Sequence, residues 1–115
     1  MFYGCSSLSN LDLSSLSVGA ASNLSSMFSG CKQLADLDLS NWSISGDLSY
    51  MFDSCTSLHT VNLSSVSAQS ITSFAYAFRG CSSLESLDLS AWNVAGSTDL
   101  TSMLSGCSNL RSVNL

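Results

Sequence analysis

The stretch that decides the fold is AFRGCSSLESLDL at residues 77–89, because every repeat of the chain opens with a version of it. The other versions are MFYGCSSLSNLDL at 1–13, MFSGCKQLADLDL at 27–39, MFDSCTSLHTVNL at 51–63 and MLSGCSNLRSVNL at 103–115. Successive copies therefore begin 26, 24, 26 and 26 residues apart. A fixed period of roughly 20–50 residues is typical of solenoids, in which each repeat forms one coil of a stack.

The end of each copy predicts a short strand. Leu11, Asp12 and Leu13 alternate between apolar and polar side chains, and the same alternation recurs in every copy. Alternation with a period of two residues indicates a strand that is buried on one face. We expect one such strand per coil, stacked in parallel on its neighbours along the array.

A second alternation, at Trp42 and Ile44, predicts an extended segment after the strand. Trp42 and Trp92 share a column with aliphatic residues of the other copies, so both are expected in the core. A loop of variable length should follow. It has three residues between Ile44 and Leu48 but five in the other copies, which accounts for the difference between 24 and 26.

Each coil is also expected to hold a short helix. Leu48, Met51 and Phe52 have the i, i+3, i+4 spacing of a helix face. The residues before these segments are favoured helix N-caps, and a Gly, or Ser54 in one copy, follows as a terminator. The expected caps are Asn23, Asp47, Ser73 and Asp99. The predicted fold class is therefore an α/β solenoid with one short parallel strand and one short helix per coil of 24–26 residues.

The domain organisation follows from the repeats. We expect a single array over residues 1–115, with coils at 1–26, 27–50, 51–76 and 77–102 and a partial coil at 103–115. Solenoids normally end in polar capping repeats, and neither end of this sequence has one. We therefore expect a segment of a longer protein.

Composition and charge exclude several classes of function. The net charge is −5, with three basic residues among 115, so there is no basic patch to neutralise phosphates. A nucleic-acid partner is not expected, and no apolar run is long enough for a membrane span. The 30 Ser residues fill positions between regular apolar columns, which is unlike the composition of a disordered chain.

One Cys occurs per coil, and three interpretations compete. Disulfides between neighbouring coils are possible by distance, although stacked side chains point in parallel and five is an odd number. Metal binding requires converging ligands, which this spacing does not offer. The favoured interpretation is a structural ladder of thiols that bond weakly to backbone carbonyls. The column comprises Cys5, Cys31, Cys55, Cys81 and Cys107.

The pattern F-x-x-C-x-x-L-x-x-L-x-L, clearest at residues 78–89, resembles the BspA-like leucine-rich repeat family over the whole chain. The resemblance implies a leucine-rich-repeat solenoid of secreted or cell-surface proteins, often with a role in adhesion or host contact. It assigns framework roles to the Phe, Cys and Leu columns. The chain departs from the general leucine-rich repeat at the usual Asn position, which Leu16, Trp42, Val66 and Trp92 occupy, so no asparagine ladder is expected.

The candidate binding surface is the exposed face of the predicted strands. One column varies strongly in side-chain chemistry, and we expect His59 beside Glu85 with Arg111 on the other side of Glu85. A second set of exposed residues is acidic, with its densest part at Asp12, Asp36 and Asp38; Asp88 continues it. Calcium could bind there through carboxylates, but bonding to the local backbone or to water is the favoured interpretation, and no metal site is predicted.

No enzymatic motif stands out. His59 is the only His, and with 30 Ser residues its proximity to some Ser carries no weight. No cofactor motif is present. Tyr50 and Tyr76 share a column with Ser26 and Ser102, so both are expected to face outward, either as interface anchors or as surface filler.

The leading hypothesis is a non-enzymatic module of an extracellular or cell-surface protein that binds a protein or glycan partner through the strand face. The alternative is a structural spacer in a larger surface protein. The sequence does not identify the partner or predict the oligomeric state.

Overall fold

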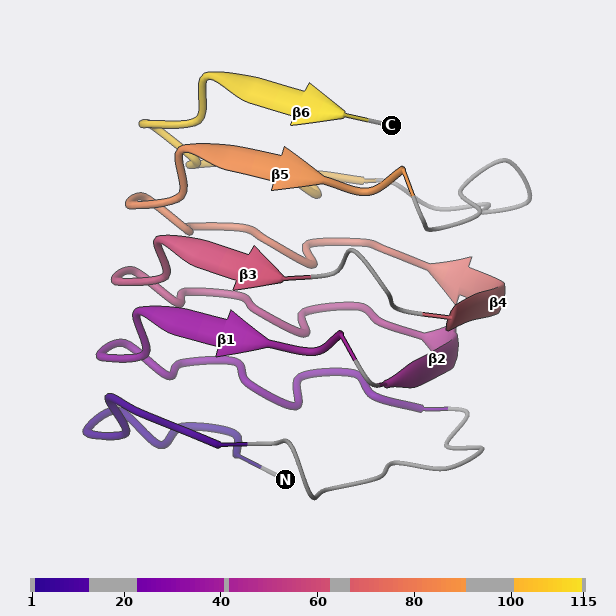
Figure 1. Cartoon of the computed structure of the whole chain (residues 1–115), viewed down its shortest axis with the longest axis horizontal. Coiled ribbons are helices and arrows are strands. Elements are labelled where there is room, and N and C mark those ends of the chain that lie inside the picture. Colours follow the sequence, from indigo (N-terminus) through magenta and orange to yellow (C-terminus); the bar gives the residue numbers. More distant parts are fainter. Residues whose placement is uncertain (1, 13–22, 41, 63–66, 91–100, 115) are drawn as a thin grey trace.

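The repeats lie one above another as the rungs of a stack (Figure 1). This arrangement comes from a computed structural model in which the structure describes residues 2–12, 23–40, 42–62, 67–90 and 101–114. We number the rungs 1 to 5 in the order of the five sequence copies. Backbone hydrogen bonds join each described rung to the next, and the Phe2 N–H, for example, donates to the Met27 carbonyl at 2.9 Å.

Short parallel strands form one face of the stack, as the alternation predicted. They are β1 (Asp36–Asp38), β3 (Thr60–Asn62), β5 (Ser86–Asp88) and β6 (Ser112–Asn114). Strand β1 pairs with β3, and β5 pairs with β6. The central Leu37 of β1 and Leu87 of β5 are each only 3% exposed, while their neighbours in the strand are exposed. We call the exposed side of these strands the strand face.

A second parallel pair lies at the far end of the rungs. It joins β2 (Ser43–Asp47) to β4 (Ser67–Ser73). The register shifts on both sides of Gly46, so that Ser45 is opposite Gln69 but Asp47 is opposite Ser73. This shift accommodates the two-residue difference in length between the repeats, and it lies where the sequence predicted a loop of variable length. In these two rungs the predicted loop is therefore strand.

The predicted helix per coil is wrong: the structure has no helix within the residues that it describes. In rung 3 the Met51 N–H donates to the Leu48 carbonyl at 3.2 Å, and the Asp53 N–H donates to the Tyr50 carbonyl at 3.1 Å. These are successive tight turns. Tyr50 and Ser54 have φ values of 58° and 61°, and a left-handed residue at every fourth position interrupts any right-handed helix.

The physical reason is that the backbone donors of these turns bond between rungs. The N–H groups of Tyr50, Phe52 and Ser54 donate to the carbonyls of Ala75, Ala77 and Arg79 at 3.0, 2.7 and 2.7 Å. A helix would instead bond the same donors to carbonyls within its own segment. A buried backbone N–H needs one acceptor, and here the carbonyl of the next rung already provides it. The fold is therefore a solenoid of parallel strand pairs and turns, and not an α/β structure.

The predicted caps keep their hydrogen bonds without a helix. Asn23, Asp47 and Ser73 accept from the backbone N–H two residues further on, at 3.0, 2.8 and 3.2 Å. This i to i+2 bond is the usual Asx or Ser turn, which resembles the start of a helix. Asp99 lies outside the described residues.

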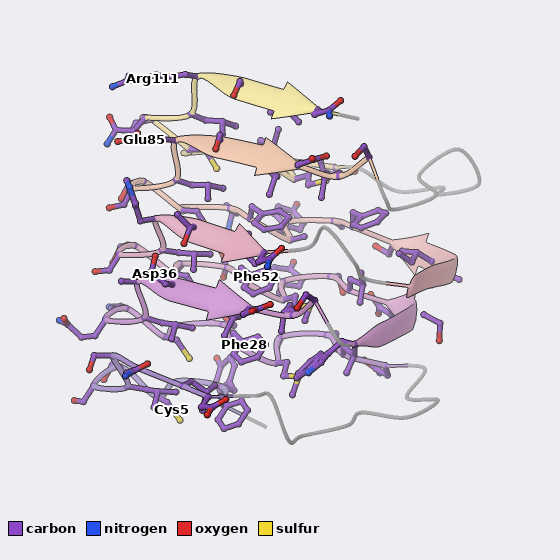
Figure 2. The ribbon with its side chains drawn as sticks, in the orientation of Figure 1. Cys5, Phe28, Asp36, Phe52, Glu85 and Arg111 are labelled. Carbon is purple, nitrogen blue, oxygen red and sulfur yellow. The ribbon has the colours of Figure 1, made fainter. Side chains whose placement is uncertain are left out.

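The core contains a ladder of stacked rings. Neighbouring rings of Phe2, Phe28, Phe52 and Phe78 have centroids 5.4, 5.5 and 5.1 Å apart. Figure 2 shows Phe28 and Phe52 behind the strands, between the two faces of the stack. Trp42 is 2% exposed, as predicted; Trp92 lies outside the described residues.

Candidate functional site

The Cys column links each rung to the one before it. In rungs 2 to 5 each thiol donates to the carbonyl of the Phe in the preceding rung, as from Cys55 to Phe28 at 3.1 Å and from Cys81 to Phe52 at 3.2 Å. Cys31 and Cys107 make the same bond, to Phe2 and Phe78. All five Cys residues are free thiols.

Burial decides the chemistry of this column. Removal from water raises the pKa of Cys55 to about 12 and also raises the pKa of Cys31 and Cys81, because burial disfavours the thiolate. Such thiols are poor nucleophiles and poor metal ligands. Cys5, in contrast, is exposed at the first rung (Figure 2).

The variable column runs along one edge of the strand face. His59, Glu85 and Arg111 are all exposed, and Figure 2 shows Glu85 and Arg111 one above the other on the same side of the stack. Backbone hydrogen bonds join this column in two separate pairs, since the His59 N–H donates to the Ala35 carbonyl at 2.7 Å and the Arg111 N–H to the Glu85 carbonyl at 2.8 Å.

The side chain of His59 bonds to the backbone of the next rung. His59 Nδ1 lies 3.3 Å from the carbonyl oxygen of Ser83, a residue of rung 4. Of these described residues, neither His59 nor Arg111 forms a salt bridge with Glu85. All three side chains are exposed to solvent.

The acidic residues of the strand face have local hydrogen-bond partners. Asp38 and Asp88 accept from the backbone N–H groups of Ser40 and Ser90, each at 2.9 Å. Hydrogen bonds from the Ser40 and Ser90 side chains, and then from these backbone groups, lower the pKa of the two carboxyls. Both carboxylates end a strand by closing a turn.

Asp36 accepts a hydrogen bond from the Thr60 hydroxyl on the next rung, and Asp12 is exposed in rung 1. Across the part of the chain that the structure describes, no three His, Cys, Asp or Glu side chains gather where they could hold a metal ion. This arrangement gives the calcium hypothesis no support.

The opposite side of the stack carries a second cluster of functional groups. It lies on the segments of successive turns, which we call the turn face. Asp53 accepts from Arg79 Nε at 2.7 Å and from Arg79 Nη2 at 3.0 Å, and these bonds raise the pKa of Arg79. The rings of Tyr50 and Tyr76 stack with centroids 4.8 Å apart and an interplanar angle of 11°.

The repeat pattern predicted only half of this cluster. It placed Tyr50 and Tyr76 in one outward column but overlooked the pair of Asp53 and Arg79. The signal was present, because these two residues are 26 positions apart, which is one repeat. We call the four residues the tyrosine–arginine patch.

Within the residues that the structure describes, no helix is long and apolar enough to cross a bilayer.

Comparison with protein families gives one result. The family model described as the BspA type leucine rich repeat region matches the chain in six copies, over residues 1–93 and 48–115. No curated protein and no solved structure matches the chain.

Proposed function

The chain belongs to the BspA-type leucine-rich repeat family, and from this premise we propose that it binds a protein partner through its strand face. Repeats of this family usually occur in bacterial surface or secreted proteins, and leucine-rich repeats are generally non-enzymatic interaction modules. We further propose that residues 1–115 form one continuous array within a surface protein that acts in adhesion or host contact.

The observation that carries the proposal is the contrast between a uniform framework and one variable exposed column. Rungs 2 to 4 repeat the same buried Leu and Cys positions, whereas His59, Glu85 and Arg111 occupy equivalent exposed positions. A backbone hydrogen bond holds Arg111 beside Glu85, and His59 Nδ1 lies 3.3 Å from the Ser83 carbonyl oxygen in the rung of Glu85, so little conformational entropy is lost when a partner binds.

Charge supports a protein with a basic contact surface. Asp12, Asp36, Asp38 and Asp88 are exposed, and the lowered pKa of Asp38 and Asp88 keeps these carboxylates ionised in mildly acidic solution. The negative charge of these carboxylates attracts a positively charged protein and increases its association rate at low salt. A glycan partner would depend less on ionic strength.

The alternative is a structural spacer. The rung-to-rung bonds recur at equivalent positions, as in the donation from Phe28 N–H to Met51 and from Phe78 N–H to Met103, at 2.9 and 3.0 Å. A framework this regular suits a rigid support, which needs no partner.

The test compares binding of the array with and without the variable column. The protein would be applied to immobilised panels of extracellular proteins and of glycans, and the test variant would carry His59→Ala, Glu85→Ala and Arg111→Ala. A matched control would carry Lys32→Ala and Gln33→Ala, which are exposed residues of a turn before β1.

Binding to a protein that is lost in the triple variant and kept in the control would support the proposal. Binding that survives the triple substitution would place the interface elsewhere. An array that binds nothing on either panel would favour the spacer.

A further inference from the structure

The strand face is interrupted between rungs 3 and 4. Strand β1 pairs with β3, and β5 pairs with β6, but no backbone hydrogen bond joins β3 to β5, although the structure describes every residue of both strands. Figure 1 shows a wider interval between β3 and β5 than within either pair. We call this interval the seam, and we call rungs 2–3 and rungs 4–5 the two blocks of the stack.

The direction of neighbouring hydrogen bonds identifies the backbone groups that face the seam. Peptide groups along a strand point alternately to one neighbouring strand and to the other. The Asn62 carbonyl accepts from a residue of rung 2, which leaves Val61 to face the seam. The Leu89 N–H donates to a residue of rung 5, which leaves Asp88 to face the seam from the other side. In a continuous parallel sheet, the N–H groups of Val61 and Asp88 would both donate across it.

Burial also distinguishes the seam from the rest of the strand face. Leu37 and Leu87, the central residues of β1 and β5, are each 3% exposed. Val61 occupies the equivalent position of β3 and is only half-buried, although it packs against the core. Water therefore reaches the centre of the strand face at the seam.

Exposed hydrogen bonds cross the junction of rungs 3 and 4 before the strands begin. His59 Nδ1 lies 3.3 Å from the Ser83 carbonyl oxygen. The hydroxyls of Ser83 and Ser82 donate to the Thr56 carbonyl at 2.7 and 3.4 Å. Because water can replace an exposed hydrogen bond, these contacts add little to the cost of separating the two rungs at this face.

The turn face, in contrast, holds the same two rungs together. The Phe52 N–H donates to rung 4 at 2.7 Å, and the tyrosine–arginine patch adds side-chain contacts across the same junction. The rings of Tyr50 and Tyr76 stack, and Arg79 bonds to Asp53. The Arg79 guanidinium carbon also lies 5.5 Å from the ring centroid of Tyr50. In rungs 2 and 5, the equivalent positions are Ser26, Ser29, Ser102 and Ser105.

We propose that the junction of rungs 3 and 4 is a hinge, at which the two blocks pivot about the turn face while the seam opens and closes. The pairs β1–β3 and β5–β6 keep each block rigid, and the seam lacks the backbone bonds that would hold the blocks at one angle. On closing, the Val61 N–H donates to the Ser86 carbonyl, and the Asp88 N–H donates to the Val61 carbonyl. The tyrosine–arginine patch is the pivot.

The hinge divides the variable column of the strand face. His59 lies on one block, whereas Glu85 and Arg111 lie on the other and are joined by a backbone hydrogen bond. Pivoting therefore changes the position of His59 relative to Glu85 and leaves the spacing of Glu85 and Arg111 fixed. A partner that contacts both blocks would select one angle of the hinge.

The first test is NMR relaxation dispersion on the backbone amides of the whole chain, which detects motion on the microsecond-to-millisecond timescale of hinges. Val61 and Asp88 should show dispersion. Leu37 and Leu87 are the matched controls, because their N–H groups point into pairs that are already formed, and their profiles should be flat. Flat profiles at Val61 and Asp88 would overturn the proposal.

Hydrogen exchange measures the same junction at both faces. The Val61 amide should exchange at least about 100-fold faster than those of Leu37 and Leu87. At the turn face, the Phe52 amide should be as protected as that of Phe28, which donates across the junction of rungs 2 and 3. A Val61 amide as protected as the two Leu amides would mean that the seam is closed, and would overturn the proposal.

A matched variant tests the pivot. Tyr50→Ser with Tyr76→Ser copies the residue of rungs 2 and 5, which has the same left-handed backbone conformation. Without the stacked rings, exchange of the Phe52 amide should rise about tenfold, while that of Phe28 stays unchanged. An unchanged Phe52 amide, with the fold retained by circular dichroism, would overturn the assignment of the pivot.

These measurements use the chain without a partner, and the parent protein alone decides whether the seam moves. The triple variant at His59, Glu85 and Arg111 should keep the dispersion at Val61 and Asp88. The hinge and the proposed binding function can therefore fail separately.

Discussion

In rungs 2 to 5 each Cys and the Phe of the preceding rung form a small unit that spans two rungs. The Cys81 thiol donates to the Phe52 carbonyl at 3.2 Å, and both side chains are fully buried. A thiol is small enough to fit between the rungs, and its weak donor still satisfies a buried carbonyl. The thiol thereby takes the place of a backbone N–H donor at a position where the chain turns.

The buried thiols predict a loss of stability in alkaline solution. Burial raises the pKa of Cys55 from 9.0 to about 12, so the folded state holds this proton more tightly than the unfolded state. The associated stability is complete below pH 9.0 and is lost as the pH rises towards about 12. Urea unfolding at about pH 11 should show on the order of 2 kcal/mol less stability than at neutral pH.

The control for this prediction is Cys55→Ala, in which the alkaline loss should shrink. An identical pH dependence in the variant and the parent would show that other groups cause the loss.

Gly80 and Ser54 occupy equivalent left-handed positions, and substituting each by Ala separates backbone strain from other effects. Gly80 has φ = +75°, and a Cβ placed there would lie 3.5 Å from the Ser54 Cα, which is ordinary contact. Gly80→Ala should therefore cost only the backbone strain, about 1–2 kcal/mol of unfolding free energy. Ser54→Ala is the matched substitution, because Ser54 already has a Cβ at φ 61°; its effect should stay within about 0.5 kcal/mol. Equal effects in urea unfolding would refute the assignment of strain.

At the scale of elements, the sequence predicted the strands well and the turns poorly. Leu37 and its exposed neighbours in β1 show the alternation that a strand requires. The spacing of Leu48, Met51 and Phe52 suited a helix, but linked turns place the same residues inward. The backbone N–H groups of these turns donate to carbonyls in the next rung. The acceptors are far away in the sequence, so a local pattern of residues cannot predict these bonds.

The aromatic ladder predicts a graded response at Phe52, which stacks on Phe28 and Phe78. Phe52→Ala should cost about 3–5 kcal/mol of unfolding free energy, because it leaves a cavity and removes both stacked pairs. Phe52→Leu should cost less, since Leu104 stands at the equivalent position of rung 5. Thermal or urea unfolding would measure both variants, and a Leu variant as unstable as the Ala variant would contradict a role for fitted volume.

At the scale of the whole molecule, the repeat period alone determined which residues share a face. It placed His59, Glu85 and Arg111 at equivalent positions, and in the structure all three are exposed and a backbone hydrogen bond joins Arg111 to Glu85. It could not predict that His59 turns towards the Ser83 carbonyl, because a side-chain rotamer depends on local packing. The same period also connects Asp53 to Arg79, although only the structure shows their paired hydrogen bonds.

A stack in which each rung contacts only its neighbours predicts a dependence on position. Leu37 is 3% exposed and has a rung on either side, whereas Leu11 in rung 1 is half-buried. Leu37→Ala should cost about 2–5 kcal/mol, and Leu11→Ala clearly less. Hydrogen exchange should also show wider loss of protection for the Leu37 variant. Equal destabilisation would argue against nearest-neighbour stacking.

The central claim is that the turn segments bond between rungs and form no helix. The most direct measurement is the NMR scalar coupling across backbone hydrogen bonds, which identifies the carbonyl that accepts from each N–H. For Phe52 N–H, the structure predicts a coupling to the carbonyl carbon of Ala77, across the 2.7 Å bond. A coupling to the carbonyl carbon of Leu48 instead, four residues earlier, would reveal a helix and contradict the account.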